Sequence, residues 1–479
     1  MNAKHSTSDR RSVYRAAVSL LLCIALTTLA GCKSTASVAD HFVAARDGQF
    51  FIGNEPYTYI GTNLWYASIL GSEGQGGNRE RLQKELDLLC ELGVKNVRVL
   101  VGGEGMSTLP DHIRPNLQPR PGEYNDTLLQ GLDYLMVELG KRDMKAVLYL
   151  HNAWQWSGGY GTYLEWAGEG EAAPANVWNA YTSYHSRFVR NDSARAMALR
   201  HTRFIVSRTN SITGRPYAED PALMAWEICN EPRPFARDTE TKEAFLGWIA
   251  EQARAIKEID PNHLVTTGSE GKFGCEVDMD LFERVHSLSD IDYLCIHIWP
   301  FTWNWIGRFA SPSTEAKLAN DPAVVTDRVA DACRETRAYI DEHMAVARRC
   351  GKPIVLEEFG YPRDSFEISP HATTFGRDRY YDFVLSLVGQ PLTTDSLSTI
   401  ADTPQPLGLS GCNFWSWGGL GQVRPLSADI PDIRPGFWQP WDDYTGDPAQ
   451  EEQGLYSVFA TDSTTLSVIR NRTQAHKTF

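Results

Sequence analysis

The sequence lacks the features that identify several large classes of protein. No two of its nine cysteines have Cys-x-x-Cys spacing, and no group of His, Cys and Asp has the spacing of metal ligands. A phosphate-binding loop and a Gly-x-Ser-x-Gly nucleophile elbow are also absent. The net charge is −14, with no basic stripe, which argues against a nucleic-acid partner. We therefore expect no disulfide framework, no metal and no cofactor.

One apolar run stands out, and it lies at the N-terminus. Four basic residues precede the stretch 16–30, which has the length of a signal-peptide core and is short for a membrane span. The run ends in Leu29-Ala30-Gly31-Cys32. Small residues before a cysteine resemble a bacterial lipobox, whose cysteine is lipidated and becomes the mature N-terminus.

The lipobox predicts how the N-terminal region is processed. We expect a lipoprotein signal peptide over 1–31, lipidation at Cys32 and a lipidated tether over 32–46. Cleavage of an ordinary secretory signal near Ala36 is the alternative. Lys33 after the cysteine, in place of Asp, fits an exported protein that a lipid anchors to a bacterial outer membrane.

The remaining chain alternates between apolar, strand-like runs and amphipathic helical patterns. Strands are predicted at 57–66, 96–101, 145–151, 223–231, 264–270, 293–300, 354–360 and 409–419. Helical spacing predicts helices at 79–92, 128–139, 241–259, 327–349 and 463–474. Asn78 is the expected N-cap of the first of these helices. Eight buried strands separated by helices predict an α/β fold, a (β/α)8 TIM barrel that forms one catalytic domain over 47–479.

Two connections are too long for simple links. Residues 152–220 follow the third predicted strand, and residues 419–455 follow the eighth. Both would leave the barrel at its C-terminal face, where such barrels build their sites. Their length favours a site that is closed at one end, but it leaves endo and exo action both open.

Carboxylates stand at the tips of two predicted strands. Glu231 follows the run Trp226-Glu227-Ile228-Cys229-Asn230, and Glu357 and Glu358 lie in the run 354–360. Adjacent strand residues point to opposite faces, so only one of this second pair is expected to face the barrel axis. We choose Glu358, which is nearer the mouth, and expect Glu357 to be paired outside the axis. Two tip carboxylates are what cleavage of a glycosidic bond needs: one protonates the leaving oxygen, and the other attacks the anomeric carbon or activates water.

Other strand ends carry candidates for substrate binding. Arg98 is a charge inside an apolar strand, and we expect it to hold Glu358 ionised, with a structural ion pair as the alternative. As the acid, Glu231 would need a raised pKa, for example from a nearby negative charge. Trp415 is favoured over Trp417 as the floor beneath the reacting sugar. The complete candidate set for substrate binding is Arg98, Asn152, Asn230, His297, Trp299, Trp415, Trp65, Trp154 and Trp417.

On these residues the chain resembles glycoside hydrolase family 5, a retaining family of clan A with its carboxylates on strands four and seven. The resemblance rests on Asn230-Glu231-Pro232-Arg233, Leu356-Glu357-Glu358-Phe359-Gly360, Gly61-Thr62-Asn63-Leu64-Trp65-Tyr66, Asn152 with Trp154-Gln155-Trp156-Ser157-Gly158-Gly159, and Phe414-Trp415-Ser416-Trp417-Gly418. These strings are similar to the β-mannanase branch. Residues 446–454 are similar to a group of bacterial mannan-active enzymes, some of which are exo-acting β-mannosidases. Trp299 stands where many members carry Tyr, and His151 where mannanases often carry Asn.

The resemblance implies a hydrolase of β-1,4-mannosidic bonds in mannan or manno-oligosaccharides. Glu231 would be the acid/base of a double displacement, Glu358 the nucleophile, and Asn230 the partner of the sugar 2-hydroxyl. The two carboxyl groups should then lie roughly 5–5.5 Å apart. We expect a monomer whose partner is β-mannan. The alternatives are a cellulase-type β-1,4-glucanase on the same scaffold and a non-catalytic glycan-binding surface lipoprotein.

Overall fold

The computed structural model describes residues 41–106, 111–306, 322–369, 371–390, 408–424, 436–440 and 442–476. The predicted signal peptide, Cys32 and most of the predicted tether lie outside these residues. Residues Phe42–Phe479 form one unit, which is described here by itself. Among the described residues, every helix is too short or too polar to cross a membrane.

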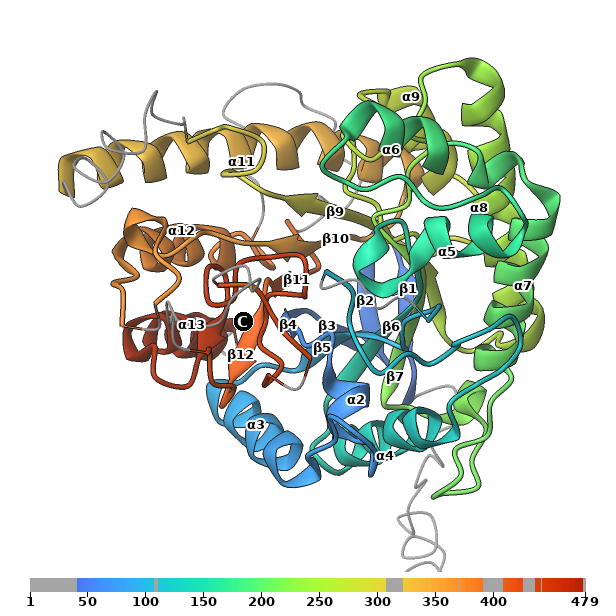
Figure 1. Cartoon of the computed structure of the whole chain (residues 1–479). Coiled ribbons are helices and arrows are strands. Elements are labelled where there is room, and N and C mark those ends of the chain that lie inside the picture. Colours follow the sequence, from blue (N-terminus) through green and yellow to red (C-terminus); the bar gives the residue numbers. More distant parts are fainter. Residues whose placement is uncertain are drawn as a thin grey trace, which may run out of the picture. The chain divides into compact units, whose positions relative to one another are not determined.

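Eight parallel strands form the central sheet, with helices around it (Figure 1). They are β4 (Tyr59–Asn63), β5 (Asn96–Leu100), β6 (Lys145–Asn152), β7 (Leu223–Asn230), β8 (Leu264–Thr266), β9 (Leu294–Ile298), β10 (Ile354–Phe359) and β11 (Gly411–Phe414). Their spatial order is β8-β7-β6-β5-β4-β11-β10-β9. The two end strands meet through Asp292 N, which donates to Val265 O (2.8 Å), and Thr266 Oγ1, which donates to Tyr293 O (3.1 Å). The predicted (β/α)8 barrel is confirmed.

The helices lie where apolar residues recur at helical spacing. They are α2 (Ala67–Leu70), α3 (Arg79–Leu92), α4 (Asp126–Lys141), α5 (Gly159–Trp166), α6 (Trp178–His185), α7 (Asp192–Val206), α8 (Thr239–Ile259), α9 (Met279–His286), α11 (Pro322–Cys350), α12 (Phe375–Leu385) and α13 (Ser463–His476). The Asn78 side chain accepts from Arg81 N (2.9 Å) and caps α3 as predicted. Gly93 ends this helix with a φ of 79°, which glycine adopts without steric cost.

A small antiparallel sheet closes the N-terminal end of the barrel. Its strands are β1 (Val43–Arg46), β2 (Gln49–Ile52) and β3 (Glu55–Tyr57). Phe50 packs edge-on against Tyr293 at 5.3 Å, within a buried cluster that contains residues from both the small sheet and the barrel. The folded unit therefore begins before residue 47, because β1 pairs with β2 over residues that we had assigned to the tether.

The eighth predicted strand, 409–419, is divided in two. The chain leaves the barrel after β11 and forms β12 (Trp417–Gly419), which pairs with β13 (Val458–Phe459). The return path from β12 to β13, of which the structure describes residues 420–424, 436–440 and 442–457, therefore begins beyond the C-terminal end of β11. The residues on this return path form one wall of the site.

Candidate active site

Glu231 and Glu358 meet at the C-terminal mouth of the barrel. Glu358 lies in β10, and Glu231 directly follows β7. His297 on β9 bridges them, with its Nδ1 2.8 Å from Glu231 Oε1 and 3.3 Å from Glu358 Oε2. One oxygen of each carboxylate and a nitrogen of His297 lie within 4.8 Å of one another. Three strand ends thus bring the predicted pair together, with only 8% of Glu231 and 3% of Glu358 exposed.

Arg98 on β5 organises the floor of this site. Its Nη1 donates to Glu358 Oε1 (2.5 Å) and Asn63 Oδ1 (3.0 Å). Its other donors bind both oxygens of Glu227 (2.5 and 2.7 Å) and Asn230 Oδ1 (2.8 Å). All five guanidinium N–H groups are therefore used. Arg98 therefore pairs both with a structural carboxylate, Glu227, and with Glu358.

Glu227 was missed by the sequence analysis. It is fully buried on β7, where burial raises its pKa to about 8 in spite of the opposing effect of Arg98. The signal that could have found it was present, because a second charge inside an apolar run needs a buried partner of opposite sign.

Glu357 lies inside the barrel, so its predicted position outside the axis is wrong. Tyr293 Oη donates to Glu357 Oε1 (3.0 Å), and Tyr293 belongs to the buried cluster at the N-terminal end of the barrel. The pairing register of β10 shifts between Leu356 and Glu358. Such an irregularity breaks the strict alternation on which the prediction rested. Burial raises the pKa of Glu357, and nothing places it at the mouth.

The two mouth carboxylates favour the protonated form of His297. Burial alone would lower the pKa of this imidazole, but Glu358 and Glu231 raise it to about 10. Burial alone would raise the pKa of Glu231, but the interaction with His297 outweighs burial, and the pKa of Glu231 is lowered. The predicted raised pKa of Glu231 is therefore wrong for the free site, because a cation lies closer to it than we expected.

A pocket of about 470 Å³ opens above these groups, which is within the usual range for small-molecule sites. Six of the predicted residues line it, namely Trp154, Asn230, Glu231, Trp299, Glu358 and Trp415. Trp154 Nε1 donates to Glu231 Oε2 (2.6 Å), and Trp299 packs edge-on against Trp415 at 5.8 Å. The aromatic walls and the carboxylates therefore share one cavity.

Asn152 acts on the pocket through its neighbours. Its Oδ1 accepts from Asn230 Nδ2 (3.1 Å) and from the backbone N of Trp154 (3.0 Å). Its Nδ2 donates to Ser157 Oγ (2.9 Å). Asn152 thus orients two lining residues, Asn230 and Trp154, and lies behind the pocket wall.

Trp65 and Trp417 do not reach the pocket, contrary to the prediction. Trp65 Nε1 donates to Gly446 O (2.9 Å), and its ring packs edge-on against Trp156 and Tyr444. Trp417 is fully buried in β12, after the chain has left the barrel. The Trp65 ring thus supports the loop after β11, and the preference for Trp415 over Trp417 agrees with the pocket lining, which contains only Trp415 of the two.

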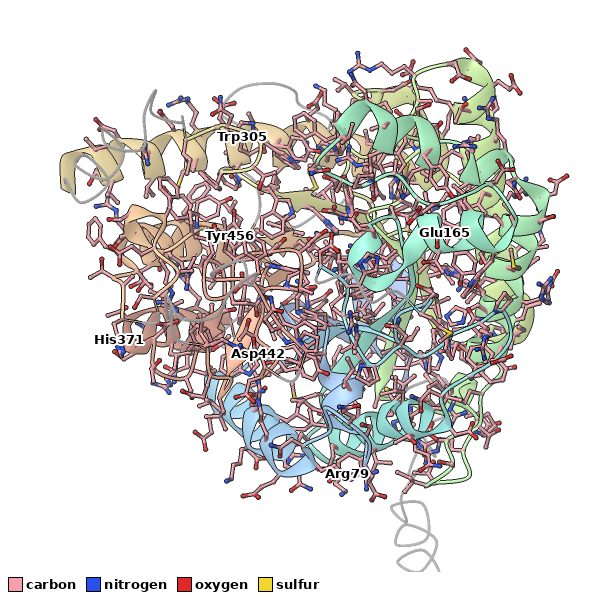
Figure 2. The ribbon with its side chains drawn as sticks, in the orientation of Figure 1. Arg79, Glu165, Trp305, His371, Asp442 and Tyr456 are labelled. Atoms are coloured by element: carbon pink, nitrogen blue, oxygen red, sulfur yellow. The ribbon has the colours of Figure 1, made fainter. Side chains whose placement is uncertain are left out.

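The loop after β11 adds lining residues that were not predicted, namely Pro448, Gln450, Glu451 and Tyr456. Figure 2 labels Tyr456, close to the centre of the molecule in that view. The conspicuous string at 446–454 could have indicated that this segment matters. Its side chains could not be placed from sequence, because a long loop has no periodicity.

A second group of ligand-type residues, Glu104, His151 and His201, lies behind the barrel wall. His151 Nε2 is 2.8 Å from Thr202 Oγ1, and Tyr163 Oη is 3.3 Å from Glu104 Oε1. Two candidate ligand atoms, His151 Nδ1 and Glu104 Oε1, are 3.9 Å apart, wider than the roughly 3.4 Å between ligands of tetrahedral zinc. We interpret the group as a buried hydrogen-bond network.

Comparison with known proteins agrees with this geometry. A family model described as GH family 5 beta-mannosidase-like matches residues 40–479. The mannan endo-1,4-beta-mannosidase 1 of Arabidopsis thaliana is 28% identical over 348 residues, which are 69% of this chain and 75% of the relative. A putative mannan endo-1,4-beta-mannosidase 9 of Oryza sativa subsp. japonica is 27% identical over 380 residues, 77% of this chain and 82% of the relative.

Solved structures show the same relationship. A glycoside hydrolase family 5 mannosidase from Rhizomucor miehei shares 30% identity with a TM-score of 0.72, over 91% of this chain and 97% of that one. An endo-1,4-beta-D-mannanase from Thermotoga petrophila shares the fold, with 21% identity and a TM-score of 0.57 over 88% of this chain and 100% of that one. The chain therefore belongs to the β-mannosidase-like group of glycoside hydrolase family 5 and is a glycosidase.

Proposed function

We propose that this enzyme is a retaining, exo-acting β-mannosidase that releases mannose from the non-reducing end of β-1,4-linked manno-oligosaccharides or mannan. The observation that carries the proposal is one pocket that holds both tip carboxylates and is walled by the loop after β11. The names of the relatives support a mannoside substrate. A glutamate-to-alanine variant of the Rhizomucor miehei mannosidase was solved in complex with mannosyl-fructose, which also supports it.

The chemistry follows from the two carboxylates. Glu358, held by Arg98 at 2.5 Å, attacks the anomeric carbon while Glu231 gives a proton to the departing glycosidic oxygen. The mannosyl group is then esterified to Glu358. Glu231, now ionised, takes a proton from water, whose oxygen displaces Glu358 and yields mannose of retained configuration. Mouth oxygens within 4.8 Å of each other fit the roughly 5–5.5 Å carboxyl spacing of retaining enzymes better than the roughly 6.5–9.5 Å of inverting ones.

His297 supplies the protonation state that this cycle needs. In the free site its Nδ1 holds a proton 2.8 Å from Glu231 Oε1. A shift of that proton along the hydrogen bond converts Glu231 into the acid, and His297 then remains as a neutral neighbour. The proton required by the leaving group is therefore stored one hydrogen bond away.

Exo action is supported by the hydrogen bonds that fix the wall of the pocket formed by the loop after β11. We call residues 446–457 the strap. Asp447 Oδ1 accepts from Tyr456 N (2.9 Å), and its Oδ2 accepts from Gly454 N (2.8 Å) and Ser457 N (3.2 Å). Buried Arg377 donates to Leu455 O (2.6 Å) and Ser457 O (3.0 Å). The strap is thus tied both to itself and to α12, and it forms a fixed end to the pocket.

Glu451 places a carboxyl group at this closed end. Its Oε2 and Trp415 Nε1 are both buried without a hydrogen bond of good geometry among the described residues, although the two side chains are close enough for the indole N–H to act on the carboxyl group. Burial raises the pKa of Glu451, and the charges of Asp447, Glu358 and Glu231 raise it further. A buried polar atom without a partner is costly unless a ligand satisfies it. Sugar hydroxyls of a terminal mannose would satisfy both atoms.

Replacing Glu451 by alanine is expected to lower kcat/KM for mannobiose by about 10–100-fold, the loss of one or two hydrogen bonds to a buried polar group. The opened end should also allow internal cleavage, so mannobiose, mannotriose and mannotetraose would appear early from mannohexaose, beside the mannose and mannopentaose of terminal cleavage. Glu452→Ala is the matched control, because the neighbouring Glu452 is exposed. Equal kinetics of the two variants would contradict a binding role for Glu451.

The proposed function is tested by following products chromatographically from mannohexaose, linear β-1,4-mannan and carboxymethyl cellulose. From mannohexaose, mannose and mannopentaose as the only early products support exo action, since each terminal cut releases both. Early mannobiose, mannotriose and mannotetraose would overturn it in favour of an endo-mannanase. Activity on the cellulose alone would overturn the mannoside substrate altogether.

We also propose, from the sequence, that the enzyme is exported and anchored in a bacterial outer membrane through a lipid on Cys32. The string Leu29-Ala30-Gly31-Cys32 after a short apolar run supports this. Such an anchor would hold the barrel at a membrane surface, where oligosaccharides pass between the outside and the cell.

A further inference from the structure

A column of aromatic rings runs along one face of α6. Trp178, Tyr181 and His185 are three and four residues apart and therefore lie above one another on the helix. The rings of Trp178 and Tyr181 are stacked with centroids 6.0 Å apart, and those of Tyr181 and His185 with centroids 3.7 Å apart. Trp154 stacks against both Tyr181 (5.9 Å) and Trp178 (6.2 Å). The column thus joins α6 to the pocket wall.

The outer end of the column is left uncovered. Tyr181 and His185 are buried, whereas 50% of Trp178 is exposed. A large apolar ring gains free energy when its surface leaves water, and no described residue covers this half of the indole. The same residue lines the pocket together with Ala175. The uncovered surface therefore belongs to the rim of the catalytic cavity.

The contacts of Trp154 identify which side of the scissile bond this rim serves. Trp154 Nε1 donates to Glu231 Oε2 (2.6 Å), and Glu231 is the group that protonates the departing oxygen. The strap with Glu451 closes the end that receives the terminal mannose. Trp178 is one stacked ring beyond Trp154, so a leaving group that takes its proton from Glu231 would meet this ring next.

We propose that Trp178 is the platform of a binding subsite for the second sugar of the leaving group. It would take a β-linked hexose unit, whose apolar C–H face stacks on the exposed indole as another aromatic ring would. This inference rests on the proposed function, since it places a manno-oligosaccharide across Glu231 and Glu358. It predicts that the enzyme distinguishes substrates by length beyond the bond that it cleaves.

The test compares mannobiose, which cannot reach this subsite, with mannotriose, which can. In the wild type, kcat/KM should be higher for mannotriose. Trp178→Ala should lower kcat/KM for mannotriose about tenfold, chiefly through KM, and leave mannobiose within about twofold. Trp178→Phe keeps a ring and should restore most of the loss. Phe375→Ala is the matched control, because Phe375 is 47% exposed and lines a different cavity.

Each outcome decides a separate claim. If Trp178→Ala lowers kcat/KM equally for both substrates, or for neither, the subsite is overturned. The proposed function then still stands on the activity of the wild type. A wild type that releases mannose from neither substrate overturns both claims. Thermal unfolding of Trp178→Ala and Trp178→Phe, measured alongside, separates a loss of binding from a loss of folded protein.

Discussion

Replacing Glu358 by alanine is expected to lower kcat for mannoside hydrolysis by at least about 10⁴-fold, because both displacement steps pass through this carboxylate. Azide should restore turnover in this variant. The small anion fits the space left by the carboxylate and attacks the anomeric carbon from the same face, so the product is α-mannosyl azide. A stopped assay with an aryl β-mannoside, together with mass analysis of the product, measures both effects.

The neighbouring residue provides a matched control for Glu358. Glu357 is equally buried, but its carboxyl contacts Tyr293 deep in the barrel (3.0 Å). Glu357→Gln should therefore keep kcat within about tenfold of the wild type and form no mannosyl azide, since it leaves every group at the mouth in place. If Glu357→Gln abolished turnover and Glu358→Ala did not, the assignment of the nucleophile would be wrong.

Replacing Arg98 by methionine is expected to lower the free energy of unfolding by about 3–5 kcal/mol, the usual cost of removing one partner from a buried ion pair. The reason is that Glu227 and Glu358 would lose the cation that they share. Asn63 and Asn230 would also lose their hydrogen-bond donor. Activity should fall with stability, because Glu358 would lose the hydrogen bond that holds its carboxylate in place. Urea unfolding and kcat on the same preparations measure the two losses.

A substitution at a second arginine serves as the control that distinguishes the role of Arg98 in stability from its role in activity. Arg208 pairs with Asp133 through two hydrogen bonds (2.6 and 2.9 Å), and neither residue lines the pocket. Arg208→Met should destabilise the fold and leave kcat per folded molecule unchanged. Arg98→Lys keeps the charge but offers at most three donors, so it should recover part of the stability. Full activity of Arg98→Met would contradict the role of Arg98 in holding Glu358.

The barrel and its catalytic centre could be predicted because their signals are local. Buried parallel strands are continuous apolar runs, and a polar residue at the tip of such a run stands out. Arg98, Glu231 and Glu358 were found in this way, as was the N-cap of α3 at Asn78. The parallel order of the strands then brings their C-terminal ends together, so residues far apart in sequence share one mouth.

The remaining features depend on contacts that no local pattern records. Glu451 reaches the pocket because Asp447 and Arg377 fold the strap back over the mouth. Trp65 was expected at the sugar, but the returning loop covers it. Glu357 was assigned by strict alternation, which the irregular register of β10 breaks. The charge state of Glu231 was also misjudged, because it depends on a 2.8 Å contact with His297.

The central claim is that a carboxylate pair in a closed pocket removes terminal mannose with retained configuration. Proton NMR of mannohexaose, followed from the first minutes of hydrolysis, tests it most directly. The account predicts mannose and mannopentaose as the sole early products, with the β anomer of mannose in excess before mutarotation. The α anomer in excess, or internal fragments without mannose, would contradict it.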